Sequence, residues 1–254
     1  MAKLKALIFD VDGTLANTEE AHRKAFNHSF AQANLDWVWS VELYTKLLKV
    51  TGGKERIRFF VETELKQNIS DEQVAALHQA KNKHYQEMVL DKKLPLRPGI
   101  MRIIEQAREN NLILAIATTT SPGNVNNLVK ATMGEDALAW FSIIAEGELV
   151  PIKKPEPDVY EYVLNQLSLS AEECIAFEDS YNGVQAATRI NLPTLITSNN
   201  YTVGDDFDGA MMVLDSLGDE NSPCHVLQSE VDIKMGKSID LETLIEMHRV
   251  YTSA

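Results

Sequence analysis

Short apolar runs alternate with longer amphipathic segments before residue 18 and after residue 93. The first run, residues 5–9, predicts a strand buried on both faces, and Gly13 marks the turn that ends it. Similar runs predict further strands at residues 112–117, 143–144, 174–177, 194–197 and 211–214. Helical spacing predicts helices at residues 100–110, after Ser121-Pro122, and at residues 156–167, 183–190 and 241–251. Strands separated by such helices need crossover connections, so we expect an α/β fold whose parallel sheet has helices on both faces.

The segment between these two parts has a different pattern. It contains no proline, and apolar residues recur at helical spacing from Ala21 and again from Val74. This pattern predicts two long helices with shorter helices between them. We therefore expect a helical domain of residues 18–93 inserted into a core formed by residues 1–17 and 94–254.

Charge and composition restrict the possible partners. The formal net charge of −13 disfavours nucleic acids, because an acidic protein repels phosphate backbones. No run approaches the roughly 18 apolar residues of a membrane span, so no membrane partner is expected. Met1-Ala2-Lys3 leaves no room for a signal peptide before the first strand, and Cys174 and Cys224 lack the spacing of metal ligands. We expect a monomer in the cytoplasm, or in the chloroplast stroma if a transit peptide has been removed.

Two carboxylates follow the first predicted strand. Asp10 and Asp12 are two residues apart, so they share a face for as long as the strand continues. Neighbouring carboxylates at a buried strand end are costly unless a proton, a cation or a metal neutralises them. Taken alone, an Asp-Gly turn that only ends the strand is an equal alternative.

Polar residues also follow three later strands. Thr118 and the next two threonines offer hydroxyls and amides at a helix start, which suits a phosphate oxygen. Lys154 precedes a helix that begins with proline, and Glu178 and Asp179 add two carboxylates. Each has an ordinary alternative as a capped turn, a solvated lysine or a helix cap. Ligands bind beyond the carboxyl ends of parallel strands, so we expect the four motifs to meet in one site.

Together the four motifs resemble those of the haloacid dehalogenase-like hydrolases, which transfer phosphoryl groups through an aspartate nucleophile. The resemblance covers essentially the whole chain. It implies a Rossmann-like, doubly wound core with the inserted α-helical cap domain of the family's first subclass. It also implies that Asp10 is the nucleophile that forms a phosphoaspartyl intermediate, and that Asp12 is the general acid and base.

The resemblance assigns roles to the remaining motif residues. Thr118 and the Thr119 amide would bind the transferring phosphoryl group, and Lys154 would balance its charge. Mg²⁺, the implied cofactor, would be held by Asp10, the backbone carbonyl of Asp12, Asp179 and, in support, Glu178. These roles are chemically coherent, because an anionic phosphate ester repels a carboxylate nucleophile unless a metal and a lysine cancel charge.

The first motif narrows the reaction within the family. Dehalogenases lack its second aspartate and phosphonate hydrolases carry alanine there, whereas this chain has Asp12. The β-phosphoglucomutases share Thr18 and His22, although a surface position is an equal alternative for this helical histidine. The mutases have a Lys-Asn pair where this chain has Ser121-Pro122. A mutase is therefore the second choice.

Segments 51–56 and 117–125 resemble the CbbY group of the family, whose studied members hydrolyse xylulose 1,5-bisphosphate. By this resemblance, Lys54 and Arg56 would bind the distal phosphate of a sugar bisphosphate, helped by the amides of Gly52 and Gly53. His22, which the mutases share, is a further candidate substrate-binding residue. The ordinary alternative for this loop is a solvated turn between helices. Three hypotheses remain: a Mg²⁺-dependent sugar bisphosphate phosphatase, which we favour, a hexose-phosphate mutase, and a non-catalytic module that binds a phosphate ligand.

Overall fold

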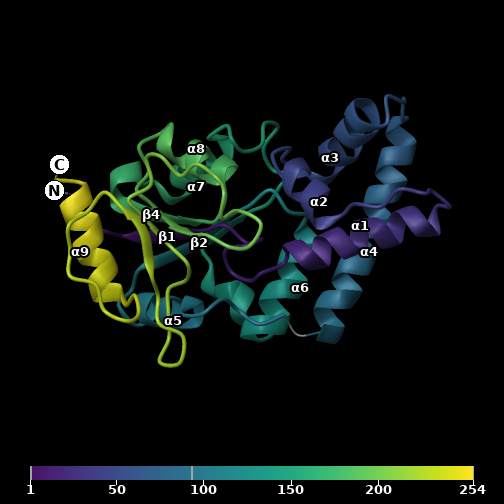
Figure 1. The fold of residues 1–254 in the computed structure, drawn as a ribbon. Helices are drawn as coiled ribbons and strands as arrows, with labels where there is room; N and C mark the ends of the chain where they lie inside the picture. The colour runs from purple at the N-terminus through teal and green to yellow at the C-terminus, as the bar shows by residue number, and fades with distance from the viewer. Residues whose placement is uncertain (1, 93, 254) are drawn as a thin grey trace.

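The computed structural model describes residues 2–92 and 94–253, in which the strands form a seven-stranded sheet of order β3-β2-β1-β4-β5-β6-β7 (Figure 1). The strands are β1 Ala6–Phe9, β2 Ile113–Ala117, β3 Ile143–Ala145, β4 Cys174–Glu178, β5 Thr194–Thr197, β6 Met212–Leu214 and β7 Val226–Ser229. Strands β1 to β6 pair in parallel, as the alternating pattern predicts. Because β1 lies between β2 and β4, Asp10 follows a central strand of the sheet.

Nothing in the hydrophobic pattern predicts β7, which pairs antiparallel with β6. All four residues of β7 are exposed, so no apolar run marks it. The register shifts between Val213 and Leu214, an irregularity of the kind that protects sheet edges from further pairing. The parallel sheet thus ends in a short antiparallel edge strand.

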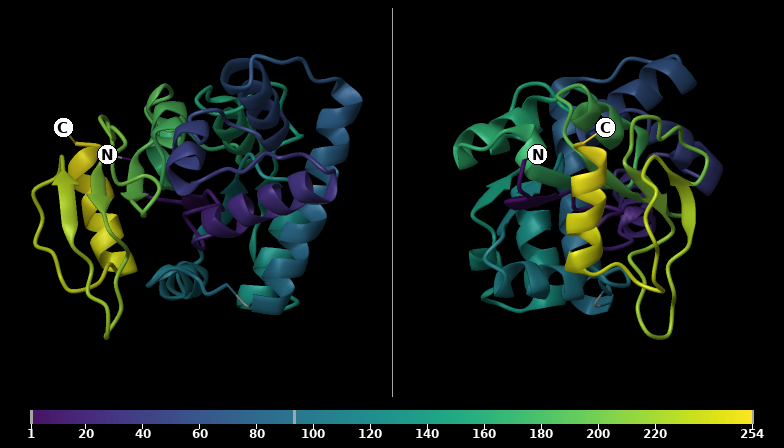
Figure 2. Two further views of the ribbon diagram at one scale, coloured as in Figure 1. Left: turned by 45° about the vertical axis from the view of Figure 1, so that its right-hand side comes forward. Right: turned by 90° about the vertical axis from the view of Figure 1, so that its left-hand side faces the viewer.

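Helices cover both faces of the sheet (Figures 1 and 2). On one face, α5, α6 and α9 share a hydrophobic cluster with Leu7 and Phe9, and on the other α7 and α8 share one with Ala6 and Ile8. Alternate residues of β1 therefore point to opposite faces, and all are buried. The predicted doubly wound, Rossmann-like α/β fold is confirmed. These helices are α5 Ile100–Glu109, α6 Pro122–Met133, α7 Asp158–Leu167, α8 Tyr181–Thr188 and α9 Leu241–Tyr251, with 3₁₀ turns at Ala137–Trp140 and Ala171–Glu173.

Between β1 and β2 the chain forms a group of helices, residues 19–92, which we call the helical insertion (Figure 1). It comprises α1 Glu19–Gln32, α2 Val41–Leu47, α3 Gly53–Phe59, a π-helical turn Phe60–Glu64 and α4 Asp71–Lys92. Its own hydrophobic cluster is rich in buried aromatic side chains: Phe26, Phe30, Trp39, Tyr44 and Phe60. Two long helices with shorter ones between them match the predicted pattern. The expected domain boundary at Lys93 lies outside the described residues.

The insertion joins the sheet through two segments that lie side by side. Ala16 and Leu96 form an antiparallel bridge, and the Arg97 amide donates to the Leu15 carbonyl at 2.8 Å. The buried Arg97 guanidinium donates to four backbone carbonyls, those of Gly13, Thr197, Ser198 and Asp215. These contacts fix the junction to the same edge of the sheet as the first motif.

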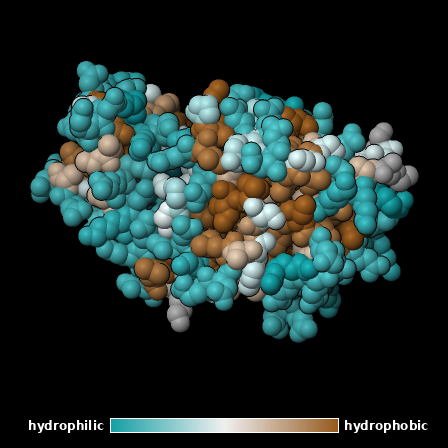
Figure 3. Space-filling model, turned by 180° about the vertical axis from the view of Figure 1, so that it is seen from behind, coloured by the Kyte–Doolittle hydropathy of each residue, from teal (hydrophilic) through white to brown (hydrophobic). Residues whose placement is uncertain are grey.

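The face seen from behind is mostly hydrophilic, with hydrophobic residues gathered near its middle (Figure 3). Charged residues make up 24% of the chain, which accounts for this largely polar exterior. Within residues 2–92 and 94–253, no helix is both long enough and apolar enough to cross a membrane.

Candidate active site

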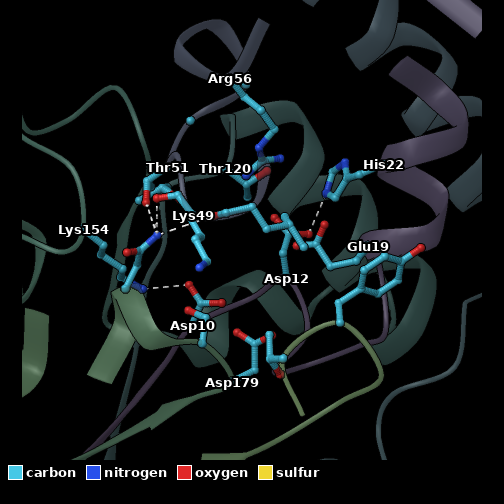
Figure 4. Close-up of a pocket in the computed structure, with 18 of the residues that line it drawn as sticks. Asp10, Asp12, Glu19, His22, Lys49, Thr51, Arg56, Thr120, Lys154 and Asp179 are labelled. Carbon is cyan, nitrogen blue, oxygen red and sulfur yellow. Dashed lines mark hydrogen bonds and ion pairs between the residues drawn. The ribbon is translucent and has the colours of Figure 1, made fainter. Parts of the chain in front are cut away.

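A cavity of about 460 Å³ lies at the carboxyl ends of β1, β2 and β4, against the helical insertion (Figure 4). Its lining combines residues that follow these strands with residues of α1, α2, α3 and α4 and of the loop between α2 and α3. The structure brings these predicted site residues to it: Asp10, Asp12, His22, Gly52, Gly53, Arg56, Thr118, Thr119, Lys154, Glu178 and Asp179. Lys54 is the predicted site residue that is not among the described residues lining the cavity.

Lys154 connects the ends of three strands. The Asp10 amide donates to the Phe177 carbonyl of β4 at 2.9 Å, which fixes the backbone of Asp10. Lys154 Nζ then donates to Asp10 Oδ1 at 2.8 Å, to Glu178 Oε1 at 2.5 Å and to the Ala117 carbonyl at 2.8 Å. An ammonium has three protons, so these contacts satisfy Lys154 completely.

The carboxylates around Lys154 outnumber it. Burial raises the pKa of Asp10, and Glu178 raises it further, although Lys154 opposes the shift. Burial also raises the pKa of Asp179 well above its usual range, helped by the charges of Asp10 and Glu178. Burial alone would lower the pKa of Lys154, but its two carboxylate partners raise it and keep it protonated. The site is therefore short of positive charge.

These carboxylates fit a divalent metal ion. One oxygen from each of Asp10, Glu178 and Asp179 lies within 4.8 Å of the others. Hard cations such as Mg²⁺ and Ca²⁺ prefer carboxylate oxygens, and one such ion would supply the missing positive charge. Asn199 Nδ2 donates to Asp179 Oδ2 at 2.7 Å and orients that carboxylate. The turn after Asp12 needs glycine at position 13, because the φ of Gly13 is +83° and a Cβ there would lie 2.0 Å from Asp179 Oδ2.

Asp12 is held by side chains from the helical insertion and the segment leading into it. The Thr18 hydroxyl donates to Asp12 Oδ1 at 2.7 Å, and His22 Nε2 lies 2.8 Å from the same oxygen. Lys81 Nζ of α4 lies 2.8 Å from His22 Nδ1. Since an ammonium can only donate, Nδ1 accepts and Nε2 carries the proton that it donates to Asp12. Lys81 thereby sets the tautomer of His22.

This arrangement favours the ionised form of Asp12. Burial alone would raise the pKa of Asp12, but His22, Thr18 and Lys81 lower it below its usual range. Burial lowers the pKa of Lys81 to about 8. His22 is 5% exposed and its ring stacks on Tyr85 with centroids 3.9 Å apart, so the surface alternative for His22 is wrong. An ionised, oriented carboxylate suits a general base.

The threonine segment after β2 forms a firmly held turn. The buried Thr118 hydroxyl accepts from the Thr120 amide at 3.3 Å, and Asn124 donates to the Thr120 hydroxyl at 3.3 Å. The Gly147 amide donates to the Thr120 carbonyl at 2.9 Å. A Cβ on Gly147 would lie 2.1 Å from the Thr119 carbonyl oxygen, so the neighbouring turn packs closely here. Thr118 and Thr119 are thus fixed at the cavity wall.

The loop between α2 and α3, together with the first turn of α3, brings cations to the opposite wall. Arg56 Nε donates to the carbonyls of Leu47 at 3.1 Å and Val50 at 3.2 Å, and Nη1 donates to the Tyr44 hydroxyl at 3.2 Å. Arg56 therefore holds the end of α2 as well as lining the cavity. Lys49 lines it too, and its side chain extends into the pocket (Figure 4).

The other predicted residues, at the end of this loop and in the first turn of α3, differ in position. Lys54 is directed away from the lining, with its ammonium 3.8 Å from Glu148 Oε1 and its side chain 50% exposed. Gly52 and Gly53 both line the cavity. A Cβ on Gly53 would lie 2.6 Å from the His78 ring, so glycine allows α3 to begin close to α4.

Comparison with known proteins identifies the family. Residues 4–191 match the family model described as haloacid dehalogenase-like hydrolase. The chain belongs to this family. This match, together with the CbbY relatives described next, supports the phosphatase activity that the motifs predict.

Within the family, the chain is similar to CbbY proteins. Protein CbbY of Cupriavidus necator is 48% identical over 229 residues, which are 88% of this chain and 90% of the relative. The crystal structure of a CbbY variant from Rhodobacter sphaeroides in complex with xylulose-(1,5)bisphosphate has a TM-score of 0.80 and 42% identity, covering 84% of this chain and 94% of that one. A β-phosphoglucomutase from Clostridium difficile, with a TM-score of 0.75 and 19% identity over 99% of this chain and 100% of that one, shares the haloacid dehalogenase-like fold.

Three residues near the site were not singled out from the sequence: Lys49, Lys81 and Asn182. Lys81 lies four residues from both Leu77 and Tyr85 on the buried face of α4, and a charge within an apolar stripe is the signal that could have found it. Asn182 Nδ2 donates to the Lys49 carbonyl at 3.1 Å. Lys49 and Asn182 carry no comparable signal, because one lies in a polar loop and the other in the first turn of a helix.

Proposed function

We propose that the protein is a Mg²⁺-dependent phosphatase of a sugar bisphosphate, with xylulose 1,5-bisphosphate as the first candidate substrate. One observation carries this proposal: a single cavity has Asp10 and Lys154 on its sheet wall and Lys49 and Arg56 on its insertion wall. A substrate with two phosphates gives both sets of cations an anionic partner. The Rhodobacter sphaeroides relative, solved in complex with xylulose-(1,5)bisphosphate, supports the same substrate class.

In the proposed first half-reaction, a carboxylate oxygen of Asp10 attacks the phosphorus atom and the bond from phosphorus to the sugar oxygen breaks. Asp12 gives its proton to the leaving sugar oxygen, which leaves a free hydroxyl and a phosphoaspartyl group. A bound phosphate anion would raise the pKa of Asp12 and so favour the protonated form that this step needs. Thr118 and the Thr119 amide hold the transferring oxygens, and Lys154 balances their charge.

In the second half-reaction, Asp12 takes a proton from water, and the water oxygen attacks the phosphorus. The acyl phosphate bond breaks, which releases inorganic phosphate and regenerates the Asp10 carboxylate. The ionised state that Thr18, His22 and Lys81 favour for Asp12 suits this step.

The metal proposed here is Mg²⁺, held by Asp10, Asp179 and the backbone carbonyl of Asp12, with Glu178 in support. Its contribution would be positive charge that allows an anionic carboxylate to approach an anionic phosphate. The shortage of positive charge around Asp10 supports this role.

The helical insertion, expected as the domain of residues 18–93, acts in this proposal as a cap that closes over the substrate and opens to release products. The loop between α2 and α3 and the first turn of α3 would bind the distal phosphate through Lys49, Gly52, Gly53, Lys54 and Arg56. Lys54 would first have to turn from Glu148 toward the cavity.

A hexose-phosphate mutase is the second candidate. The Bacillus subtilis β-phosphoglucomutase is 28% identical over 185 residues. Thr18 and His22 hydrogen-bond to Asp12, and Lys81 contacts His22, so an oriented Asp12 carboxylate could take a proton from a sugar hydroxyl as well as from water. A mutase returns the phosphoryl group to sugar, whereas a phosphatase transfers it to water.

One assay separates these reactions. The purified protein is incubated with Mg²⁺ and a panel of sugar mono- and bisphosphates, and inorganic phosphate and isomerised sugar are followed together by ³¹P NMR. We expect phosphate from the bisphosphate and a loss of activity with excess chelator. Isomer without phosphate would favour the mutase, and activity that survives the chelator would remove the metal from the proposal.

A further inference from the structure

Two adjacent lysines on the loop before α7 make contacts on different sides. Lys154 is almost fully buried and reaches Asp10. Lys153 instead lies with its Nζ 2.6 Å from Glu55 Oε1 in α3 of the helical insertion. One short loop therefore supplies the lysine that pairs with Asp10 and also forms an ion pair with the insertion.

Gly52 shows how closely this ion pair packs on the insertion. A Cβ on Gly52 would lie 2.1 Å from Glu55 Oε2 and 2.8 Å from Lys153 Nζ. The φ of Gly52 is +95°, a conformation that other residues rarely adopt. The pair thus occupies the space that a side chain at position 52 would need, so the loop between α2 and α3 is shaped around it.

A second contact holds the same loop to another part of the sheet edge. Asn182 Nδ2 donates to the Thr51 hydroxyl at 2.9 Å and to the Lys49 carbonyl at 3.1 Å. Asn182 lies in the first turn of α8, shortly after Glu178 and Asp179. Residues 49–55 of the insertion are therefore held at two places, each beside residues that surround Asp10.

We propose that Lys153 and Glu55 are positioning residues whose ion pair, here called the clasp, holds the helical insertion to the loop that supplies Lys154. Closure of the insertion and placement of Lys154 beside Asp10 then occur together. The inference rests on the proposed function, in which the insertion closes over a sugar phosphate. Because Lys153 and Lys154 are neighbours in the chain, a shift of one moves the backbone of the other. With the clasp broken, the loop is free to move and Lys154 compensates the charge of Asp10 less well. Part of the effect then falls on kcat as well as on KM.

A charge exchange tests the clasp. Glu55→Lys and Lys153→Glu each place like charges together, and the double variant restores an ion pair in the opposite direction. For each single variant we expect kcat/KM on xylulose 1,5-bisphosphate to fall about fivefold or more, the factor for a surface ion pair at the upper end of its range. We also expect backbone amides of residues 48–56 to exchange with solvent faster by a similar factor. The double variant should recover most of both losses.

Glu246→Lys is the matched control, because Glu246 pairs with Arg249 at 2.6 Å on α9, outside the cavity lining. It should change neither measurement, and thermal unfolding checks that every variant is folded. A double variant as impaired as the singles, or unchanged amide exchange in the singles, would overturn the clasp. Changed exchange together with no phosphate release from any sugar phosphate by the wild type would support the clasp and overturn the proposed function instead.

Discussion

Asp10 is the residue on which the proposed chemistry depends most directly. Asp10→Asn keeps the shape of the side chain but removes the nucleophilic oxygen and one metal ligand. We expect kcat to fall by several orders of magnitude, as removals of a nucleophile do in other enzymes. The fold should survive, because the change also relieves repulsion from Glu178 and Asp179. Phosphate release and thermal unfolding measure the two effects, and activity within tenfold of wild type would contradict the phosphoaspartyl mechanism.

Lys81 gives a pH-dependent prediction at the same scale. Burial lowers its pKa from 10.5 to about 8, so between these pH values the unfolded chain binds more protons than the folded protein does. The stability of the wild type relative to Lys81→Met should therefore rise as the pH increases from about 8 to about 10.5, by up to about 3 kcal/mol. Urea unfolding of both proteins across this range measures the difference.

Lys83 supplies the control for this experiment, because it is an exposed lysine on the same helix. Lys83→Met should differ from wild type by an amount that stays nearly constant with pH. If the stability difference for Lys81→Met also stays constant, the ammonium of Lys81 is not strongly destabilised by burial and the prediction fails.

At the scale of elements, the turn between β1 and the helical insertion depends on Gly13. Gly13→Ala would strain a backbone with φ of +83° and push a methyl group onto Asp179 Oδ2. We expect a loss of about 1–3 kcal/mol in unfolding free energy and a higher Mg²⁺ concentration at half-maximal activity. Gly236→Ala is the control, since its nearest neighbours would be 3.5 Å away. Equal behaviour of the two variants in urea unfolding and Mg²⁺ titration would show that the turn does not shape the acidic cluster.

The sequence predicts the elements that hold the motifs because burial leaves a pattern there. Leu7 and Phe9 alternate with Ala6 and Ile8 between two helical layers, so the run is apolar and its end, at Asp10, is visible. The four exposed residues of β7 leave no such trace.

Contacts between distant segments are less visible in the sequence. His22 and Lys81 are far apart in the chain, and only the packing of α1 on α4 makes them hydrogen-bonded neighbours. The positions of Lys49 and Lys54 differ for a similar reason. Arg56 and Asn182 hold the loop between α2 and α3, and the resulting fold places Lys49 of the loop at the cavity and Lys54 of α3 outside it. The composition of this segment does not reveal which of the two lysines lines the cavity.

At the scale of the whole molecule, we expect the sheet wall of the cavity to carry out the reaction and the insertion wall to select the substrate. Lys49→Ala should reduce kcat/KM for a sugar bisphosphate about tenfold to a hundredfold more than for an aryl phosphate. The reason is that an aryl phosphate has no second phosphate to bind Lys49 on the insertion wall. Lys54→Ala, measured beside it, should show the same preference only if Lys54 leaves Glu148 when substrate binds. Equal losses on both substrates in both variants would remove the distal phosphate from the proposal.

The bridge between Ala16 and Leu96 has a consequence for how such a protein can change. The two ends of a long excursion of the chain meet at neighbouring residues, so a short turn could join them with a small entropic cost of loop closure. The path of the sheet does not depend on what lies between those ends. The segment that faces the far end of the substrate could thus be exchanged as a unit, through insertion, deletion or recombination. A replacement would need new partners for Asp12 and Lys153, which His22 and Glu55 of the present insertion contact.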